Sequence, residues 1–499
     1  MQALVLALFL YLLVADHAGA GTVLPADLFF HLDPLAGLSS SLASRSFMAP
    51  VLLGLLTLAL TLALGRAWCS WACPLGTLLD WTSLRRLRHP RGRPSPWRHV
   101  KYVTLLAVLV GAVLGTLGLL VLDPITILFR TLGSGVIPGI NLAVTRGESW
   151  LYRFDALQGF LDGFDRFVRG TLLPGAEPYF VPSLALLLVM AAILAANAIR
   201  PRFWCRYLCP LGGLLGLASR VSLLRRSVDQ EKCSRCRKCA RECPVGAIDS
   251  EKEYRSDPGE CTLCLRCVEG CPAHAIALRR ETRPAAPDLE GLTRRQVLGS
   301  FGLMLAGVAL LRLPSVLRGS GRRRLRPPGS SEDDIMRRCI RCGICVNICP
   351  TRAIHPAGPG PDYDHLWTPA LVPRLGYCDY SCRRCGEACP TGAIPALTLA
   401  EKQSAVIGTA RIDTTRCIPW SQNTNCIVCQ EMCPLAEKAI ELEDVAVTNG
   451  EGLETTVRRP VVLPDRCIGC GLCEHQCPLN GEAAIRVYPE EGQGRRQGR

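Results

Sequence analysis

The 499-residue sequence is poor in the side chains that hold haem. It contains 8 histidines, and His17, His89 and His99 lie at the ends of apolar stretches or in loops, which argues against a b-type haem between membrane helices. The absence of a C-x-x-C-H sequence excludes covalent c-type haem. A glycine-rich dinucleotide fingerprint, a P-loop and a nucleophile–base pair are also absent, so neither nucleotide-dependent nor hydrolytic chemistry is indicated.

Acidic residues are fewer than basic ones, and the formal net charge is +14. Such an excess is typical of nucleic-acid binding. Here, however, the arginines lie beside apolar stretches, where basic residues set the orientation of membrane proteins. We therefore expect a bilayer rather than a nucleic acid as the partner.

Cysteine is abundant, with 28 residues. Of these, 24 form six groups of four that each end in Cys-Pro, and the other four form two C-x3-C-P pairs. A C-x2-C-x2-C-x3-C-P motif supplies three thiolates to one [4Fe–4S] cluster and a fourth to its neighbour. Zinc ribbons and disulfide scaffolds favour separated pairs and do not explain the third cysteine. Six [4Fe–4S] clusters are predicted.

The cluster ligands follow from the spacing. In a first tandem ferredoxin, one cluster takes Cys233, Cys236, Cys239 and Cys271, and the other takes Cys261, Cys264, Cys267 and Cys243. The later groups are Cys339, Cys342, Cys345 and Cys349; Cys378, Cys382, Cys385 and Cys389; Cys417, Cys426, Cys429 and Cys433; and Cys467, Cys470, Cys473 and Cys477. The middle two have wider first gaps. The Cys339 motif can pair with the Cys467 or the Cys378 motif, and we favour Cys467 because the two outer motifs are the regular ones.

An Ala-Ile pair follows every motif within a few residues. The shared isoleucine predicts a short strand whose side chain covers the cluster. The six positions are Ile248, Ile276, Ile354, Ile394, Ile440 and Ile485.

Three apolar stretches, residues 47–65, 102–122 and 179–199, have about the length that crosses a hydrocarbon core. Residues 1–15 fit either a signal-peptide h-region or a short membrane helix, and we favour the helix as the first of four spans. The basic loop 66–101 indicates the cytoplasmic side, whereas residues 16–46 and 123–178 suit the outer face. The sequence of residues 66–76 repeats at 202–212, and the Leu-Asp-Pro of residues 32–34 repeats at 122–124. The membrane domain is therefore expected to contain two repeated helical hairpins.

Both hairpins end in a C-x3-C-P pair. We expect Cys69, Cys73, Cys205 and Cys209 to converge, either on a further cluster or as a redox-active thiol set; small packing residues at helix ends are the alternative. At the opposite ends, Asp33 and Asp123 suggest proton handling or helix capping.

Arg294 and Arg295 precede an apolar run, residues 297–311, which is typical of a twin-arginine export signal. A buried or interfacial helix is the alternative. The predicted fold is an α-helical membrane domain (1–218) with four spans, plus α+β modules of the bacterial-ferredoxin 2[4Fe–4S] type at 219–289 and 336–488. A twin-arginine segment and linker (290–335) separates these modules, and a charged tail (489–499) is expected to be disordered.

On these motifs, residues 1–275 resemble ferredoxin-type proteins of the NapH type, and residues 293–485 resemble the NapG/MauM type. The resemblance implies a bacterial inner-membrane protein that takes electrons from the quinone pool and delivers them to an extracytoplasmic redox partner. It would be the electron-transfer component of a quinol-linked oxidoreductase system. Alternatives are a maturation factor for a metalloenzyme and cytoplasmic electron exchange between ferredoxin and quinone.

Overall fold

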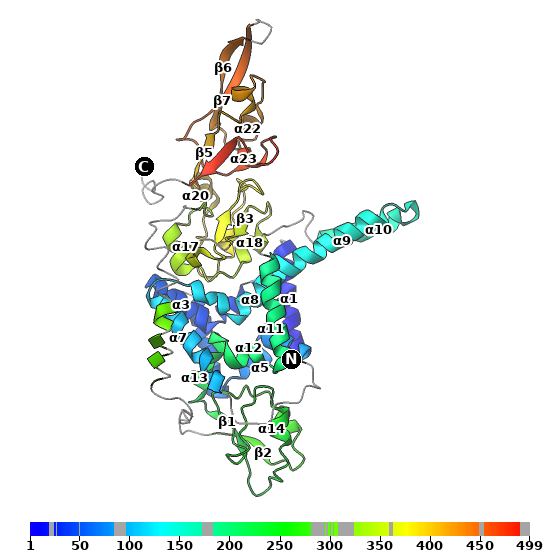
Figure 1. The fold of residues 1–499 in the computed structure, drawn as a ribbon, viewed down its shortest axis with the longest axis vertical. Coiled ribbons are helices and arrows are strands. Elements are labelled where there is room, and N and C mark those ends of the chain that lie inside the picture. The colour runs from blue at the N-terminus through cyan, green and yellow to red at the C-terminus, as the bar shows by residue number, and fades with distance from the viewer. Residues whose placement is uncertain are drawn as a thin grey trace. The chain divides into compact units, whose positions relative to one another are not determined.

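The computed structural model describes residues 1–18, 24–25, 27–48, 50–83, 96–171, 183–280, short pieces between 295 and 307, 324–358, 363–448 and 454–489. Most of the predicted twin-arginine segment, the linker 281–290 and the charged tail lie outside these ranges. The chain divides into two compact units, residues 1–317 with 340–342 and residues 318–339 with 343–499. The predicted boundary at residue 218 is not a division between them, because the first ferredoxin module belongs to the first unit (Figure 1).

Each of the four apolar stretches forms a helix in the first unit. They are α1 (Gln2–Ala18), α4 (Pro50–Leu64), α7 (Val100–Val113) and α11 (Ser183–Ile199). All are shorter than the roughly 20 residues that cross a hydrocarbon core. Gly65 (φ 72°) and Gly115 (φ 78°) follow α4 and α7, and the left-handed backbone there ends the helix. The four-span arrangement therefore stays a prediction.

One helical stretch in the described part of the chain, residues 124–151, is long and apolar enough to cross a membrane by length and composition. It consists of α8 (Pro124–Thr131), the π-helical turn η3 (Leu132–Val136) and α9 (Ile137–Leu151). The short η4 (Asp155–Leu157) and α10 (Gln158–Thr171) follow. The outer placement of residues 123–178 stays a prediction, and the part of this segment that begins at Pro124 forms a long apolar helical stretch.

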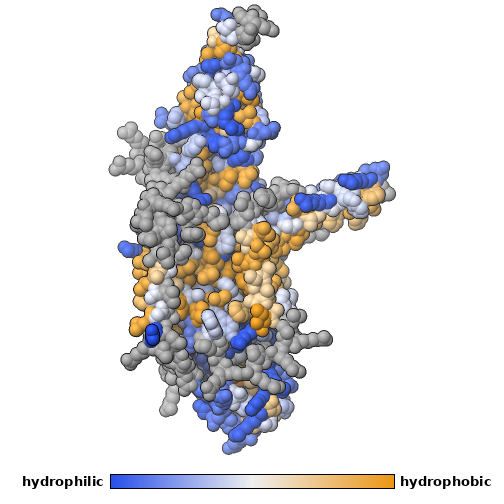
Figure 2. Space-filling model, in the orientation of Figure 1, coloured by the Kyte–Doolittle hydropathy of each residue, from blue (hydrophilic) through white to orange (hydrophobic). Residues whose placement is uncertain are grey.

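The predicted repeat forms two corresponding sets of helices. The first set is α3 (Pro34–Ser44), α4, α5 (Ala67–Trp71) and α6 (Pro74–Thr82); the second is α8, α11, α12 (Phe203–Tyr207) and α13 (Pro210–Ser219). The short α2 (Leu28–His31) precedes the first set, and η1 (Pro96–His99) and η2 (Gly118–Leu122) lie between the two sets. The first and last helix of each set begin with proline, which has no N–H to satisfy at that position. Figure 2 shows apolar side chains gathered over this helical region.

The ferredoxin module of the first unit is closed by one antiparallel strand pair. β1 (Leu224–Val228) precedes the first cluster motif, β2 (Ile276–Arg280) follows the second, and Leu224 lies opposite Arg280. Between the strands, α14 (Lys238–Glu242) packs against α15 (Arg266–Glu269). Each helix follows the middle cysteine of its motif, so the two motifs face each other.

The second unit repeats this plan twice. Its first half contains α17 (Glu332–Arg338), α18 (Ile344–Ile348), β3 (Ile354–Pro356), η5 (Tyr363–His365), β4 (Pro369–Leu371), α19 (Arg384–Glu387) and α20 (Leu399–Ser404). Its second half contains β5 (Thr409–Ile412), α21 (Ile418–Ser421), α22 (Val428–Glu431), β6 (Ile440–Thr448), β7 (Glu454–Val462), α23 (Leu472–His475) and β8 (Ile485–Tyr488). β3 pairs with β4, β5 with β8, and β6 with β7, all antiparallel.

Helix contacts in the second unit settle how its motifs pair. α18 packs against α19, and α22 packs against α23. The first motif therefore pairs with the second, and the third with the fourth. The nested pairing favoured from sequence was wrong, because regular spacing is a local property and does not report which loops meet in space.

The strands predicted after each motif are present at four positions. Ile276, Ile354, Ile440 and Ile485 each begin a strand and are buried. Ile248 forms an isolated bridge with Ser256, whereas Ile394 is buried in a bend rather than a strand. The buried side chain of Ile394 is sufficient for the predicted role of covering a cluster, and a strand is not needed there.

Two glycines of the second unit allow the cost of backbone strain to be distinguished from the cost of a steric clash. Gly392 (φ +61°) has open space around a β-carbon, whereas one on Gly469 (φ +70°) would collide with the backbone of Gly408. We expect Gly392→Ala to cost about 1 kcal/mol of folding free energy and Gly469→Ala about 1–3 kcal/mol more. Thermal unfolding of the cluster-loaded chain measures both. Equal losses would contradict the close approach at Gly408.

Candidate iron–sulfur sites

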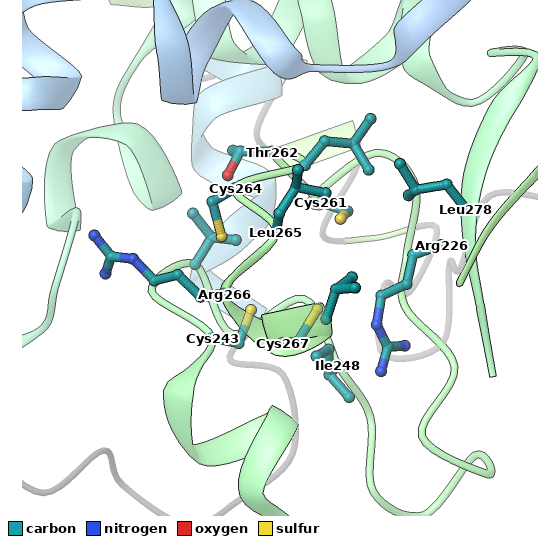
Figure 3. Close-up of a pocket in the computed structure, with 13 residues that line it drawn as sticks. Arg226, Cys243, Ile248, Cys261, Thr262, Cys264, Leu265, Arg266, Cys267 and Leu278 are labelled. Carbon is teal, nitrogen blue, oxygen red and sulfur yellow. The ribbon is translucent and has the colours of Figure 1, made fainter. Parts of the chain in front are cut away.

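The first cavity lies in the ferredoxin module of the first unit. It is lined by Cys243, Cys261, Cys264 and Cys267, and Figure 3 shows their sulfurs turned towards its interior. Apolar side chains of Ile248, Leu265 and Leu278 complete the wall. Three of these cysteines come from the second motif and one, Cys243, comes from the first.

The neighbouring cavity has the reciprocal composition. It is lined by Cys233, Cys236, Cys239 and Cys271, the last supplied by the second motif. Each cavity thus receives three cysteines from one motif and the Cys-Pro cysteine from the other. This is the arrangement that the ferredoxin spacing predicts for two adjacent [4Fe–4S] clusters.

The second half of the second unit shows the same exchange. One cavity is lined by Cys417, Cys426, Cys429 and Cys477, and another by Cys433, Cys467, Cys470 and Cys473. The eight-residue gap after Cys417 is taken up by α21, whose Pro419 lines the cavity. A wide first gap therefore still delivers three cysteines to one site.

In the first half of the second unit, the cysteine sets are assigned from contacts between residues. Cys378 and Cys385 interact electrostatically with Cys382 and with Cys349 of the preceding motif. Both sets pack around the buried core of Ile335, Ala393 and Ile394, which Cys339, Cys345, Cys385 and Cys389 contact. The ferredoxin spacing assigns Cys339, Cys345 and Cys389 to the other set. Cys342 belongs to this second set by its place in the motif.

The backbone around the middle cysteine is the same in all four regular motifs. The residues before and after it both have positive φ: Arg235 and Arg237, Leu263 and Leu265, Arg341 and Gly343, Gly469 and Gly471. Such left-handed residues turn successive N–H groups to one side and form a concave surface that favours an anion. The two motifs with wider first gaps lack this pair of positive φ values among their described residues.

The donor sets fit a cluster better than a single ion. Within the described ranges, no three His, Cys, Asp or Glu side chains lie close enough to hold one metal ion. Each cavity instead presents four thiols and no other ligand type, which suits an iron–sulfur cubane. Burial raises the pKa of Cys261, Cys378 and Cys429 to about 12. These thiols lose their protons when iron binds.

The C-x3-C-P cysteines form a separate group among the helices of the first unit. Cys69, Cys73, Cys205 and Cys209 are all buried and interact electrostatically with one another. Cys73 and Cys209 cap α6 and α13, where their Sγ atoms accept hydrogen bonds from the N–H groups of Gly76 (3.5 Å) and Gly212 (3.1 Å). We call these four residues the four-cysteine site.

Two fully buried arginines, to which the sequence analysis assigned no role, flank the four-cysteine site. Arg66 interacts with Cys69 and Cys209, and Arg202 interacts with Cys205. Arg202 also donates to both oxygens of Asp80 at 2.8 Å and to the carbonyl oxygen of Cys69 at 3.3 Å. Both arginines are part of the sequence repeat, because each precedes the first cysteine of its C-x3-C-P pair by three residues. A positive charge there offsets the charge of ligating thiolates.

The same helix ends hold the ferredoxin module. Arg66 donates to the carbonyl oxygen of Gly259 (2.6 Å), Ser70 to Thr262 (2.9 Å) and Trp71 to the carbonyl oxygen of Leu263 (3.1 Å). Lys101 and Glu260 form a buried ion pair at 2.5 Å. Arg202 interacts with Cys264 as well. The four-cysteine site is therefore adjacent to the cavity of Figure 3.

The crossed ligand sets make the cluster assignment testable. Cys477→Ser and Cys429→Ser are expected to remove the same electron paramagnetic resonance signal and one cluster's iron, because both residues line one cavity. Cys473→Ser is the matched control, since it lines the adjacent cavity and should affect a different signal. Loss by Cys477→Ser of the signal that Cys342→Ser removes would restore the nested pairing.

Comparisons with known proteins agree with these cavities. A model described as a 4Fe-4S binding domain matches residues 46–92 and 182–229, which contain the four-cysteine site, and another matches residues 226–249. Models described as 4Fe-4S dicluster domains match residues 260–354 and, separately, 338–393 and 423–480. The chain therefore carries several [4Fe–4S] clusters. No solved structure matches it.

Named ferredoxin-type relatives match both parts of the chain. The ferredoxin-type protein NapG of Escherichia coli is 35% identical over 199 residues, 38% of this chain and 80% of that protein. The ferredoxin-type protein NapH of Escherichia coli is 29% identical over 218 residues, 42% of this chain and 60% of that protein. The methylamine utilization ferredoxin-type protein MauM of Methylorubrum extorquens is 36% identical over 224 residues, 43% of this chain and 96% of that protein. At that coverage, the chain belongs to the family of ferredoxin-type iron–sulfur electron-transfer proteins that includes MauM.

Proposed function

We propose that this chain is a membrane-bound electron conduit that accepts electrons from quinol and passes them through six [4Fe–4S] clusters to an extracytoplasmic acceptor. The observation that carries the proposal is the position of the four-cysteine site. Its four thiols lie among apolar helices and, through Arg202, next to the ligands of a ferredoxin cluster. Such a site is placed to connect a lipid-soluble donor with protein-bound clusters.

The surfaces of α4 and α11 support membrane insertion. Leu52, Leu56, Leu184 and Leu188 are 51–67% exposed. Soluble proteins rarely expose apolar patches of this kind without a partner. Contact with lipid tails accounts for the exposed leucine faces of both helices, although each helix is short.

The cofactors supply the redox chemistry, and the protein supplies position and environment. Quinol oxidation releases two electrons and two protons, whereas each cluster accepts one electron. Cys69, Cys73, Cys205 and Cys209 would hold a seventh cluster or act as redox thiols. Arg66 and Arg202 would stabilise the negative charge there, and the Lys101–Glu260 pair would fix the distance to the ferredoxin module.

The entry of electrons can be tested with the full chain in liposomes that contain quinol. We expect quinol to bleach the visible absorbance of the clusters in the native chain, and Cys69→Ser to abolish this reduction. Dithionite should still reduce the clusters in the variant, which controls for their assembly. Undiminished quinol reduction in Cys69→Ser would contradict entry through this site. If a partner enzyme needs this chain only during its own biosynthesis and not during turnover, the result would favour the maturation alternative.

The side of the membrane occupied by residues 336–488 decides the acceptor. We expect protease added to intact spheroplasts to cleave this block, because the proposed acceptor is extracytoplasmic. A topology reporter fused after Arg486 measures the same property. Protection from protease, with cleavage only after lysis, would instead place all clusters in the cytoplasm and favour ferredoxin–quinone exchange.

A further inference from the structure

A second buried group lies at the starts of α3 and α8, the first helices of the two repeated sets. Asp33 and Asp123 cap α3 and α8, and both side chains are fully buried. Asp33 Oδ1 accepts from the N–H groups of Leu35 (2.8 Å) and Ala36 (3.3 Å). Asp123 Oδ2 accepts from those of Ile125 and Thr126, both at 2.9 Å. Each carboxyl group therefore uses one oxygen for its helix.

The two remaining oxygens have a different environment. Asp33 Oδ2 and Asp123 Oδ1 are buried and accept from no donor among the described residues. The two carboxyl groups interact electrostatically with each other. A proton shared between these two oxygens would satisfy both, because two carboxylates offer acceptors only. Two negative charges in contact without water are also strongly unfavourable.

The surroundings exclude water and allow one net negative charge. Phe30 and Phe129, at a centroid distance of 5.3 Å, belong to the segments that carry the pair, and both are buried. Arg130 interacts with Asp123, and its guanidinium donates to the carbonyl oxygens of Thr126 (3.1 Å) and Val121 (2.8 Å). The N-termini of α3 and α8 add favourable partial positive charge. One proton on the pair therefore balances the local charges.

This pair can respond to the four-cysteine site. α6, which Cys73 caps, packs against α8, which Asp123 caps. Asp123 also interacts electrostatically with Cys73. A negative charge added at the four-cysteine site therefore increases the affinity of the Asp33–Asp123 pair for a second proton.

We infer that Asp33 and Asp123 form a proton-binding site that holds one shared proton and takes up a second when the four-cysteine site accepts an electron. The redox half of this inference rests on the proposed function. On reduction, one electron from the quinol enters the four-cysteine site and one of the protons that the quinol releases joins the pair, so both carboxyl groups are protonated. Two such cycles account for the two electrons and two protons of one quinol. On oxidation the electron passes to the ferredoxin clusters and the proton is released.

Asparagine is the informative substitution. In Asp33→Asn or Asp123→Asn the amide oxygen still caps the helix, and the amide N–H₂ donates to the remaining carboxylate as the shared proton did. The variants keep the fold while losing the exchangeable proton. Asp27→Asn is the matched control, because Asp27 precedes α2 and bonds to His31 at 2.7 Å outside the pair.

The shared proton is tested by infrared spectroscopy of the full chain. We expect a protonated-carboxyl carbonyl band that shifts in deuterated water in the native chain and in Asp27→Asn. The band should be absent in both Asp33→Asn and Asp123→Asn. Its persistence in those two variants would overturn the shared proton, whatever the redox behaviour of the chain.

The coupling is tested by redox titration of the four-cysteine site at several pH values. The native midpoint potential should fall with rising pH, by up to about 59 mV for each tenfold decrease in proton concentration. The slope should be lost in Asp33→Asn and Asp123→Asn and retained in Asp27→Asn. An unchanged slope in the two pair variants would overturn the coupling. No redox signal at the four-cysteine site would contradict the proposed function, and the infrared band would still decide the shared proton.

Discussion

Every cluster in the ferredoxin modules needs a fourth thiolate from a second motif, and the architecture of these modules follows from that need. Cys243 and Cys271 exchange places between two cavities, as do Cys433 and Cys477. The exchange forces two loops to face each other, and the strand pairs β1–β2 and β5–β8 close the chain around them. Cluster binding to these thiols would therefore contribute directly to the folding free energy.

In the helical part of the first unit, the same helix N-terminal arrangement carries two kinds of side chain with different chemistry. Four helices begin with proline after a residue whose side chain accepts from the first turn. That residue is aspartate at one end of each repeat and cysteine at the other. Helix N-termini favour negative charge, so the same backbone arrangement suits a carboxylate or a metal-bound thiolate. The buried Arg66 and Arg202 add full charges where the cysteines meet.

The sequence allowed the local features to be predicted and left the long-range ones open. Cysteine spacing is a property of one loop, so the four residues around each cavity of the first module could be assigned. The pairing of the later motifs depends on which helices pack, and regularity of spacing misled there. The apolar stretches were identified as helices, but the short lengths of α4 and α7 depend on Gly65 and Gly115. Helix capping by Asp123 was among the alternatives, but the length of the helical stretch after Pro124 was not predicted, because the balance of charges in residues 123–178 suggested a connection. The repeat shows Arg202 three residues before Cys205, but its ion pair with Asp80 could not be predicted, because the two residues are distant in the sequence.

The crossed cysteines also limit how such a chain can change in evolution. Deleting one motif of a pair removes three ligands from one cluster and one from the other, so neither survives intact. A gene that gains or loses whole modules can therefore change its number of ferredoxin clusters only in steps of two. The four-cysteine site obeys a different rule, because each repeated half contributes two of its four thiols. Loss of either half would abolish it completely.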